Sequence, residues 1–148
     1  MKEIFVTFAT RNDRIEMADM SFKSINSLEA AKNLVANKFF TESVHLYYYS
    51  VLQMIKFKLA HLLKNALSYE KQAEKIDLNN ASTHDWLFSE IKMQLANPKE
   101  RTTFHQDFVF LKKERVDADY NERTFDVEEA LECQEIAERL LNKIKKIR

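Results

Sequence analysis

The sequence predicts an all-α protein, a compact antiparallel bundle of about five helices. The chain of 148 residues contains no glycine and one proline, where average usage would supply about ten and about seven. Lys, Glu, Leu and Ala, which favour helices, are abundant. Apolar residues recur every three or four positions through most of the chain. The absence of glycine also argues against Gly-rich phosphate loops and against turns that need a positive φ.

The chain is expected to fold as one domain, residues 1–148, because its length suits a single hydrophobic core. Residues 1–20 carry no consistent period and receive no assignment. A bundle spanning 21–147 begins with a helix at about 21–37. The apolar positions of that helix fall on one face, and they are Ile25, Leu28, Ala31, Leu34 and Val35.

The second helix, about 39–63, is apolar on more than one side, so it should lie at the centre of the bundle. Polar side chains interrupt this stretch, which argues against a membrane-spanning helix. They are His45, Gln53, Lys56, Lys58 and His61. Residues 64–80 are polar and break the helical period, so a mobile loop is expected there.

Three further helices are expected at about 82–96, 98–121 and 126–148. Each opens on residues that typically cap a helix N-terminus, namely Ser82 with Asp85, Asn97 with Pro98, and Asp126 with Glu129. Acidic residues begin the last helix and basic residues end it, which complements the helix dipole. These charge clusters therefore need no ligand to explain them.

Charge and cysteine content point to a cytoplasmic protein without a membrane segment. The 23 basic and 23 acidic residues cancel, so the whole chain exerts no net attraction on nucleic acid or on anionic membranes. Any such binding must be local. The single cysteine, Cys133, cannot form an internal disulfide, and the N-terminus lacks the layout of a signal peptide.

Arg115 is the residue that most suggests a functional site. It lies on a helical stripe that should face the core, made of Phe104, Phe108, Leu111, Arg115 and Ala118. A charge at such a position needs a partner, and Asp119, one turn further on, is the nearest candidate. Two interpretations stay open: an ordinary intrahelical ion pair worth about 0.2–0.5 kcal/mol, or a pair that lines a cleft.

The run Tyr47–Tyr49 lies in the central helix. Successive helical residues point about 100° apart, so at most two of the three hydroxyls can face any one cleft. They are equally explained as core residues whose rings are buried and whose hydroxyl groups reach solvent. Tyr48 is retained as a weaker site residue.

Thiol and metal chemistry find little support. Cys133 shares a stripe with Ala130 and Ala137, a position that suits a small inert side chain rather than a thiolate nucleophile. A carboxylate-bridged metal site in a bundle needs a Glu-x-x-His motif on each of two helices. Glu42 with His45 supplies one such motif, and the sequence contains no second. We therefore expect no catalytic cysteine, no metal and no cofactor.

Three short motifs in this order resemble one prokaryotic branch of the HEPN domains (higher eukaryotes and prokaryotes nucleotide-binding). Arg115-x-x-Ala118-Asp119-Tyr120 resembles its C-terminal Arg-x-x-Ala-Asp-Tyr signature. Tyr48-Tyr49-Ser50 resembles the Tyr-Tyr-Ala run of its central helix, with Ser in place of Ala. Thr83-His84 resembles the Thr-His or Lys-His that opens its third helix. The resemblance covers about residues 21–147.

The resemblance implies a helical homodimer, often encoded beside a small nucleotidyltransferase or within toxin–antitoxin and defence systems. Catalytic members are metal-independent ribonucleases that carry Arg, four to six residues, then His. This chain departs from that pattern, because no histidine follows Arg115. RNA cleavage without a metal needs a base of near-neutral pKa, so the departure favours a non-catalytic domain.

Three hypotheses follow. The leading one is a dimeric module that binds a nucleotide, RNA or a nucleotidyltransferase, with its cleft lined by Arg115, Asp119, Tyr120, His84 and Tyr48. Arg115 would contact phosphate or carboxylate, Asp119 would orient it, and Tyr120 would stack. The second is a ribonuclease whose base is His84 or comes from a second subunit. The third is a purely structural interaction module.

Overall fold

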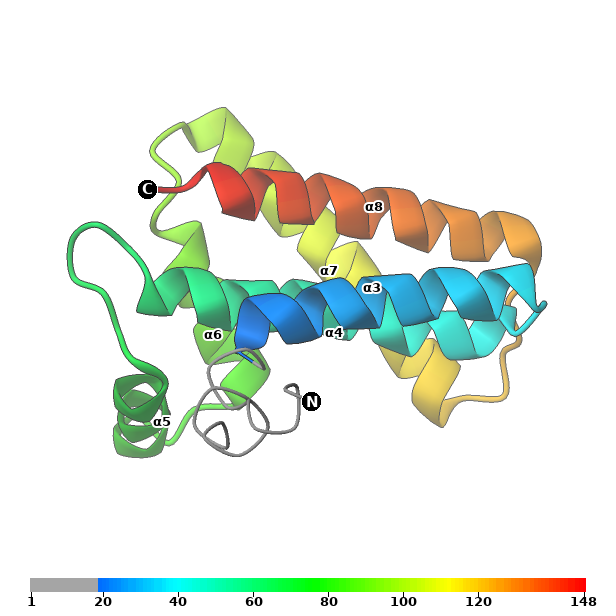
Figure 1. Cartoon of the computed structure of the whole chain (residues 1–148), viewed down its shortest axis with the longest axis horizontal. Helices are drawn as coiled ribbons and strands as arrows, with labels where there is room; N and C mark the ends of the chain where they lie inside the picture. Colours follow the sequence, from blue (N-terminus) through cyan, green and yellow to red (C-terminus); the bar gives the residue numbers. More distant parts are fainter. Residues whose placement is uncertain (1–18) are drawn as a thin grey trace, which may run out of the picture.

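The computed structural model describes residues 19–148, which form a bundle of six helices (Figure 1). In chain order the helices are α3 (Met20–Ala36), α4 (Phe40–Ala60), α5 (Tyr69–Leu78), α6 (Thr83–Lys92), α7 (Pro98–Tyr120) and α8 (Val127–Lys146). The predicted all-α class is confirmed. The segment 1–20, which received no assignment, lies outside the described residues as far as position 18.

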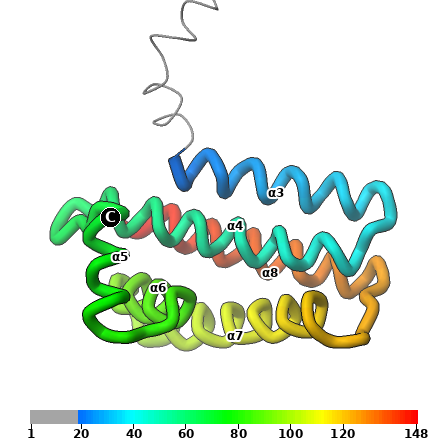
Figure 2. The backbone as a smooth tube through the Cα atoms, turned by 90° about the horizontal axis from the view of Figure 1, so that it is seen from below, coloured from blue at the N-terminus to red at the C-terminus, as the bar shows by residue number. Residues whose placement is uncertain are grey.

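Helix α4 is the central helix, as its broad apolar surface predicts. It contacts α3, α6, α7 and α8. Seen from the side, α3 forms one outer layer, α4 and α8 lie beneath it, and α6 and α7 form the opposite layer (Figure 2). Helices α3 and α4 are antiparallel neighbours joined by a short turn, and α5 sits at one end of the bundle (Figure 1).

The core is built around α4. Tyr47, Tyr48, Val51 and Ile55 are all fully buried, and the apolar stripe of α8 contributes to the same core. Full burial of one large apolar side chain contributes about 1.5–3 kcal/mol. A polar contact also sets the position of α3 relative to α4: the Ser24 hydroxyl on α3 donates a 2.6 Å hydrogen bond to the backbone carbonyl of Ser50 on α4. This bond fixes α3 against the central helix.

The predicted loop at 64–80 is wrong, because it contains helix α5. The Ser68 hydroxyl caps this helix by accepting from the backbone N–H of Lys71. Gln72 attaches it to the bundle: its side chain is 2% exposed and donates to the carbonyls of Lys56 and Leu67. The helix is anchored by one buried amide rather than by an apolar stripe, so hydrophobic periodicity does not reveal it.

The predicted N-terminal caps are confirmed, with one difference. Side chains cap α6, α7 and α8, and the capping residues are Ser82, Asn97 and Asp126. Asp126 and Glu129 form the complete reciprocal box. In α6 the returning bond is absent, because the Asp85 carboxylate accepts a 2.7 Å bond from Lys112 on α7 instead. That ion pair joins α6 to α7.

Positive φ angles occur despite the absence of glycine, which corrects the expectation drawn from composition. Lys38, Asn65 and Asn80 have φ values of 68°, 58° and 49°. Asparagine adopts this left-handed region more readily than most residues do. Lys38 follows α3 at the turn into α4, where a change of chain direction requires it. The lack of glycine therefore does not exclude turns that need a positive φ.

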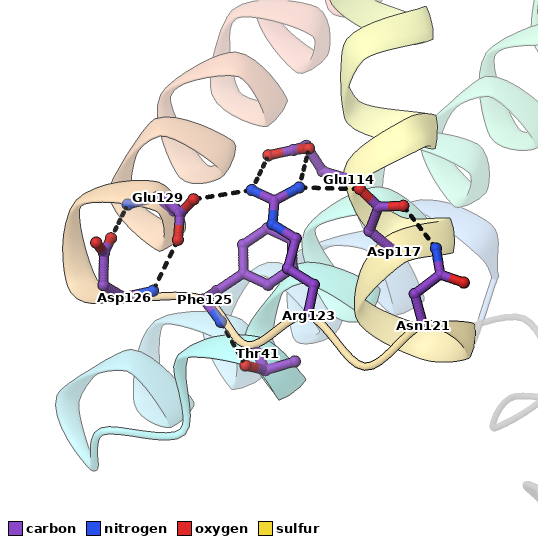
Figure 3. Close-up of polar contacts among 8 residues, drawn as sticks. All are labelled: Thr41, Glu114, Asp117, Asn121, Arg123, Phe125, Asp126 and Glu129. Carbon is purple, nitrogen blue, oxygen red and sulfur yellow. Dashed lines mark hydrogen bonds and ion pairs between the residues drawn. The ribbon is translucent and has the colours of Figure 1, made fainter.

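Arg123 holds the end of α7 against the start of α8 (Figure 3). Its guanidinium donates two bonds to Glu114, at 2.7 and 3.0 Å, and one each to Asp117 and Glu129, at 3.0 and 2.9 Å. It also lies 4.0 Å from the centroid of the Phe125 ring. Glu114 is only 6% exposed, so its carboxylate depends on this arginine for compensation.

We predict that Arg123→Met destabilises the fold by about 3 kcal/mol, measured by chemical denaturation. Removing one partner of a buried pair costs about 3–5 kcal/mol, and the partial exposure of Arg123 places the loss at the lower end. Lys112→Met is the control, because the carboxylate that Lys112 pairs with, on Asp85, is 67% exposed; this variant should lose at most about 1 kcal/mol. Equal losses would show that the Arg123 contacts do not set the stability.

Candidate functional site

All five site residues predicted from sequence lie in one cluster, where α4, the N-terminus of α6 and the C-terminal half of α7 meet. We call this cluster the arginine–tyrosine site. Each member contacts another, and the predicted members are Tyr48, His84, Arg115, Asp119 and Tyr120. The structure adds two residues of α4, His45 and Tyr49, that the sequence analysis did not assign to it.

Arg115 is the centre of the site. It is 7% exposed, and its guanidinium carbon lies 4.8, 5.7 and 5.9 Å from the ring centroids of Tyr48, Tyr49 and Tyr120. Contacts of a cation with aromatic faces are worth about 0.5–2 kcal/mol each, more when they are desolvated. Its Nε has no hydrogen-bond partner. Aromatic rings rather than carboxylates therefore surround most of this charge.

The carboxylate of Asp119 is shared between two helices. Its Oδ2 lies 3.5 Å from Nη1 of Arg115, the expected partner, and only 2.7 Å from Nδ1 of His45 on α4. His45 is therefore the closer partner. The sequence does contain a signal for it, because His45 precedes Tyr48 and Tyr49 by three and four positions and so shares their helix face. The rings of His45 and Tyr49 lie 4.5 Å apart.

Tyr48 and His84 form the second polar pair of the site, with the Tyr48 hydroxyl 3.0 Å from Nδ1 of His84. Burial raises the pKa of Tyr48 to about 12, so its hydroxyl keeps its proton at neutral pH. Burial, followed by the charges of Arg115 and Lys112, lowers the pKa of His84 below its usual value. The shift favours the neutral imidazole, and the tautomer of that ring decides which of the two groups donates this bond.

The three consecutive tyrosines divide between two sides of α4, as helical geometry requires. Tyr48 and Tyr49 have their rings at the arginine–tyrosine site. Tyr47 points the other way, and its hydroxyl donates to the side-chain oxygen of Gln134 on α8 at 3.0 Å. The prediction that at most two of the three could share a cleft is confirmed.

The remaining reactive side chains lie apart from this site. Cys133 is fully buried in the core, and burial raises the pKa of its thiol to about 12, so it is an unreactive apolar side chain as predicted. His61 stacks on Phe57, and His105 packs against Phe88. Within residues 19–148, no three His, Cys, Asp or Glu side chains are placed to hold a metal ion.

The chemistry available at the site is that of an aromatic surface with a positive field. Arg115, Lys112 and Lys56 all act on the His84 imidazole as positive charges, while Asp85 opposes them there. Tyr120 is 73% exposed and lies over Arg115 at the edge of the site. Such an arrangement attracts an anion and offers a ring for stacking.

Comparisons of the chain with protein-family models, with curated proteins and with solved structures give no match in any of the three. The site is therefore interpreted from its own geometry. Among residues 19–148, no helix has both the length and the apolar character needed to cross a bilayer.

We predict that His84 makes the fold less stable as pH falls. Because its folded pKa is lowered, the unfolded chain binds a proton more readily than the folded chain does. Stability from this residue is fully present above its unfolded pKa of about 6.5 and is lost as pH falls below it toward the folded pKa. His84→Asn removes the titration. The stability advantage of wild type over this variant, measured by denaturation, should therefore shrink between about pH 7.5 and 5. Parallel pH profiles would contradict it.

Proposed function

We propose that this chain is a non-catalytic module of the HEPN type that binds a nucleotide or RNA at the arginine–tyrosine site. One observation carries the proposal. A guanidinium whose charge is only partly balanced by a carboxylate lies among three tyrosine rings, one of them largely exposed. The positive charge would attract a phosphate group, and the exposed ring would stack with a base.

The contribution of each side chain follows from its exposure. Arg115 supplies its positive charge from beneath the surface of the site, because only 8% of its side chain is accessible. His45, with 45% of its side chain exposed, donates Nδ1–H to Asp119 and can also donate Nε2–H to a phosphate oxygen when both ring nitrogens carry a proton. Asp119 fixes the orientation of that imidazole. Tyr120 provides the stacking surface.

The wider proposal includes a homodimer, a nucleotidyltransferase partner and a toxin–antitoxin or defence context. The motif resemblance supports all three. The homodimer has an additional physical argument, because Val109 and Val116 are exposed on one face of α7. Their spacing of seven positions places them on one helical stripe that a second copy would cover.

We predict that Arg115→Met weakens binding of a short single-stranded RNA or of AMP at least tenfold. Loss of a charge-assisted contact costs about 1.5–3 kcal/mol, and each 1.4 kcal/mol is about tenfold in affinity. Fluorescence anisotropy with labelled RNA and calorimetry with AMP measure the effect. Stability should fall by only about 1 kcal/mol, because methionine keeps the contact with Tyr48 and Asp119 keeps His45.

Lys113→Met is the matched control, since it removes the same charge from an exposed position on another face of α7. Binding by this variant should stay close to that of wild type at equal salt concentration. Equal binding by wild type and by well-folded Arg115→Met would remove the site from the proposed function. A large loss of stability in Arg115→Met would favour the purely structural module instead.

A second candidate function, ribonuclease, is favoured by the pairing of His45 with Asp119. Both His45 and His84 pack against the Tyr49 ring, with centroid distances of 4.5 and 5.6 Å. A histidine oriented by a carboxylate can take the proton of a 2′-hydroxyl, whose oxygen then attacks phosphorus while the 5′-oxygen leaves with a proton from an acid. The absence of any histidine after Arg115 weighs against this function, because the catalytic members of the resembled family carry one there.

We predict no cleavage of single-stranded RNA above background in the absence of added metal, followed by gel electrophoresis over hours. If cleavage occurs and is lost in His45→Ala or His84→Ala, the ribonuclease replaces the binding module as the leading function. Cleavage that survives both substitutions and Arg115→Met would be attributed to a contaminating enzyme. His105→Ala is the control, because that histidine packs against Phe88 and lies outside the site.

A further inference from the structure

Positive charges from three helices gather at the end of the bundle where the last turn of α8 meets the connection from α6 to α7 (Figure 1). Two surface grooves of about 270 and 410 Å³ lie there. Arg101 joins them, because it lines the larger groove and donates to the carbonyls of Leu95 and Ala96, which line the smaller. We call this surface the basic end, and its Lys and Arg residues are Lys92, Arg101, Lys143, Lys146 and Arg148.

Carboxylates do not balance the charges of the basic end. Within residues 19–148 none of these five side chains forms an ion pair, and Glu100 is the one carboxylate that lines either groove. Lys92 instead lies 3.1 Å from Nδ1 of His105 and 5.0 Å from the centroid of the Phe88 ring. The helix dipole accounts for the lysines that end α6 and α8, but it opposes Arg101 near the start of α7. An anionic partner would relieve the repulsion between these like charges.

Two exposed apolar side chains accompany these charges. Met93, which directly follows α6, is 68% exposed, and Leu63, in the connection after α4, is 77% exposed. The end of α4 is held beside the end of α8, because Nζ of Lys58 donates to the carbonyls of Lys145 and Ile147 at 3.2 and 2.8 Å. The tube in Figure 2 likewise places the connection after α4 and the end of α8 at one end of the bundle. This end therefore combines positive charge with exposed apolar side chains.

We propose that the basic end binds the surface of an anionic membrane. Its Lys and Arg residues contact the lipid headgroups, while Met93 and Leu63 enter the boundary between headgroups and acyl chains. Groups of about four to eight basic residues bind anionic headgroups electrostatically, and the basic end has five. Single-stranded RNA fits this surface less well, because RNA sites of that kind stack bases on aromatic rings, and the exposed side chains named here are Leu and Met.

The basic end is separate from the arginine–tyrosine site. Arg101 and Tyr120 lie about 28 Å apart along α7. A membrane would therefore hold the protein by one end and leave the arginine–tyrosine site accessible. The inference goes beyond the proposed function and does not depend on it.

The first test is sedimentation of the full chain with two kinds of vesicle. One kind contains phosphatidylcholine alone, and the other contains equal amounts of phosphatidylcholine and phosphatidylserine. The chain should bind the phosphatidylserine vesicles at least about tenfold more tightly, and added salt should release it, because the attraction is electrostatic. Equal binding to both kinds, or binding to neither, would overturn the proposal.

The second test reverses two charges of the basic end. Lys143→Glu combined with Lys146→Glu should weaken binding to the phosphatidylserine vesicles at least about tenfold. Lys23→Glu combined with Lys113→Glu is the matched control, because it changes the net charge equally at exposed positions outside the basic end. Circular dichroism verifies that both proteins keep their helices. Similar losses in the two proteins would contradict the assignment to this surface.

The third test concerns the apolar contact. Met93→Ser keeps every charge and should weaken binding to the phosphatidylserine vesicles about threefold or more, because serine gains nothing from entering the membrane boundary. The residue is largely exposed, so the fold should tolerate the substitution. Unchanged binding would overturn the insertion of this side chain.

Two further outcomes separate this inference from the proposed function. Arg115→Met should bind the phosphatidylserine vesicles as wild type does, and a tenfold loss would overturn the assignment to the basic end. If the chain binds no vesicles, yet binds single-stranded RNA in a manner lost with Lys143→Glu and Lys146→Glu, these charges serve nucleic acid and the membrane proposal fails. Loss of RNA binding in Arg115→Met with intact vesicle binding supports both proposals.

Discussion

The structure depends on one constraint, that helix α4 is surrounded by other helices on nearly every side. A helix in this position has little surface in contact with solvent, so its buried polar groups must find partners within the protein. Tyr47 and Tyr48 are both fully buried, yet their hydroxyls reach Gln134 on α8 and His84 on α6 respectively. The same helix thus supplies the core and one wall of the candidate site, and neither can change without the other.

Arg115 near the end of α7 and Arg123 in the connection that follows it illustrate how a chain of zero net charge creates a local positive field. Arg123 is held by three carboxylates, so its charge is fully balanced and its role is structural. Arg115 has one carboxylate, at 3.5 Å, and that carboxylate is closer to His45. Tyrosine rings stabilise the Arg115 guanidinium without neutralising its charge. The difference in partners, rather than in residue type, distinguishes the structural Arg123 from Arg115, for which we propose a role in binding.

Sequence patterns predict those parts of this molecule that depend on neighbours along the chain. Helical spacing and the caps at Ser82, Asn97 and Asp126 locate most helix starts, because capping is a local interaction. Helix α5 escapes prediction because a single buried amide, Gln72, attaches it through contacts outside its own period. His45 escapes for a related reason: its partner Asp119 lies 74 positions away, and only the packing of α4 on α7 brings them together. Arg115 is predictable from sequence because its unusual feature, a charged residue on an apolar stripe, lies within a single helix.

The late position of α8 in the chain has a consequence for synthesis. The side of α4 that carries Tyr47 is covered by α8, and the residues that meet there are 87 positions apart. While the chain emerges from the ribosome, α3 and α4 can pair at once, since they are adjacent in sequence. The side of α4 that carries Tyr47 remains exposed until α8 has also emerged from the ribosome. For most of its synthesis the nascent chain therefore exposes an apolar helix face that invites association with other chains, and chaperone binding would be of greatest benefit in that interval.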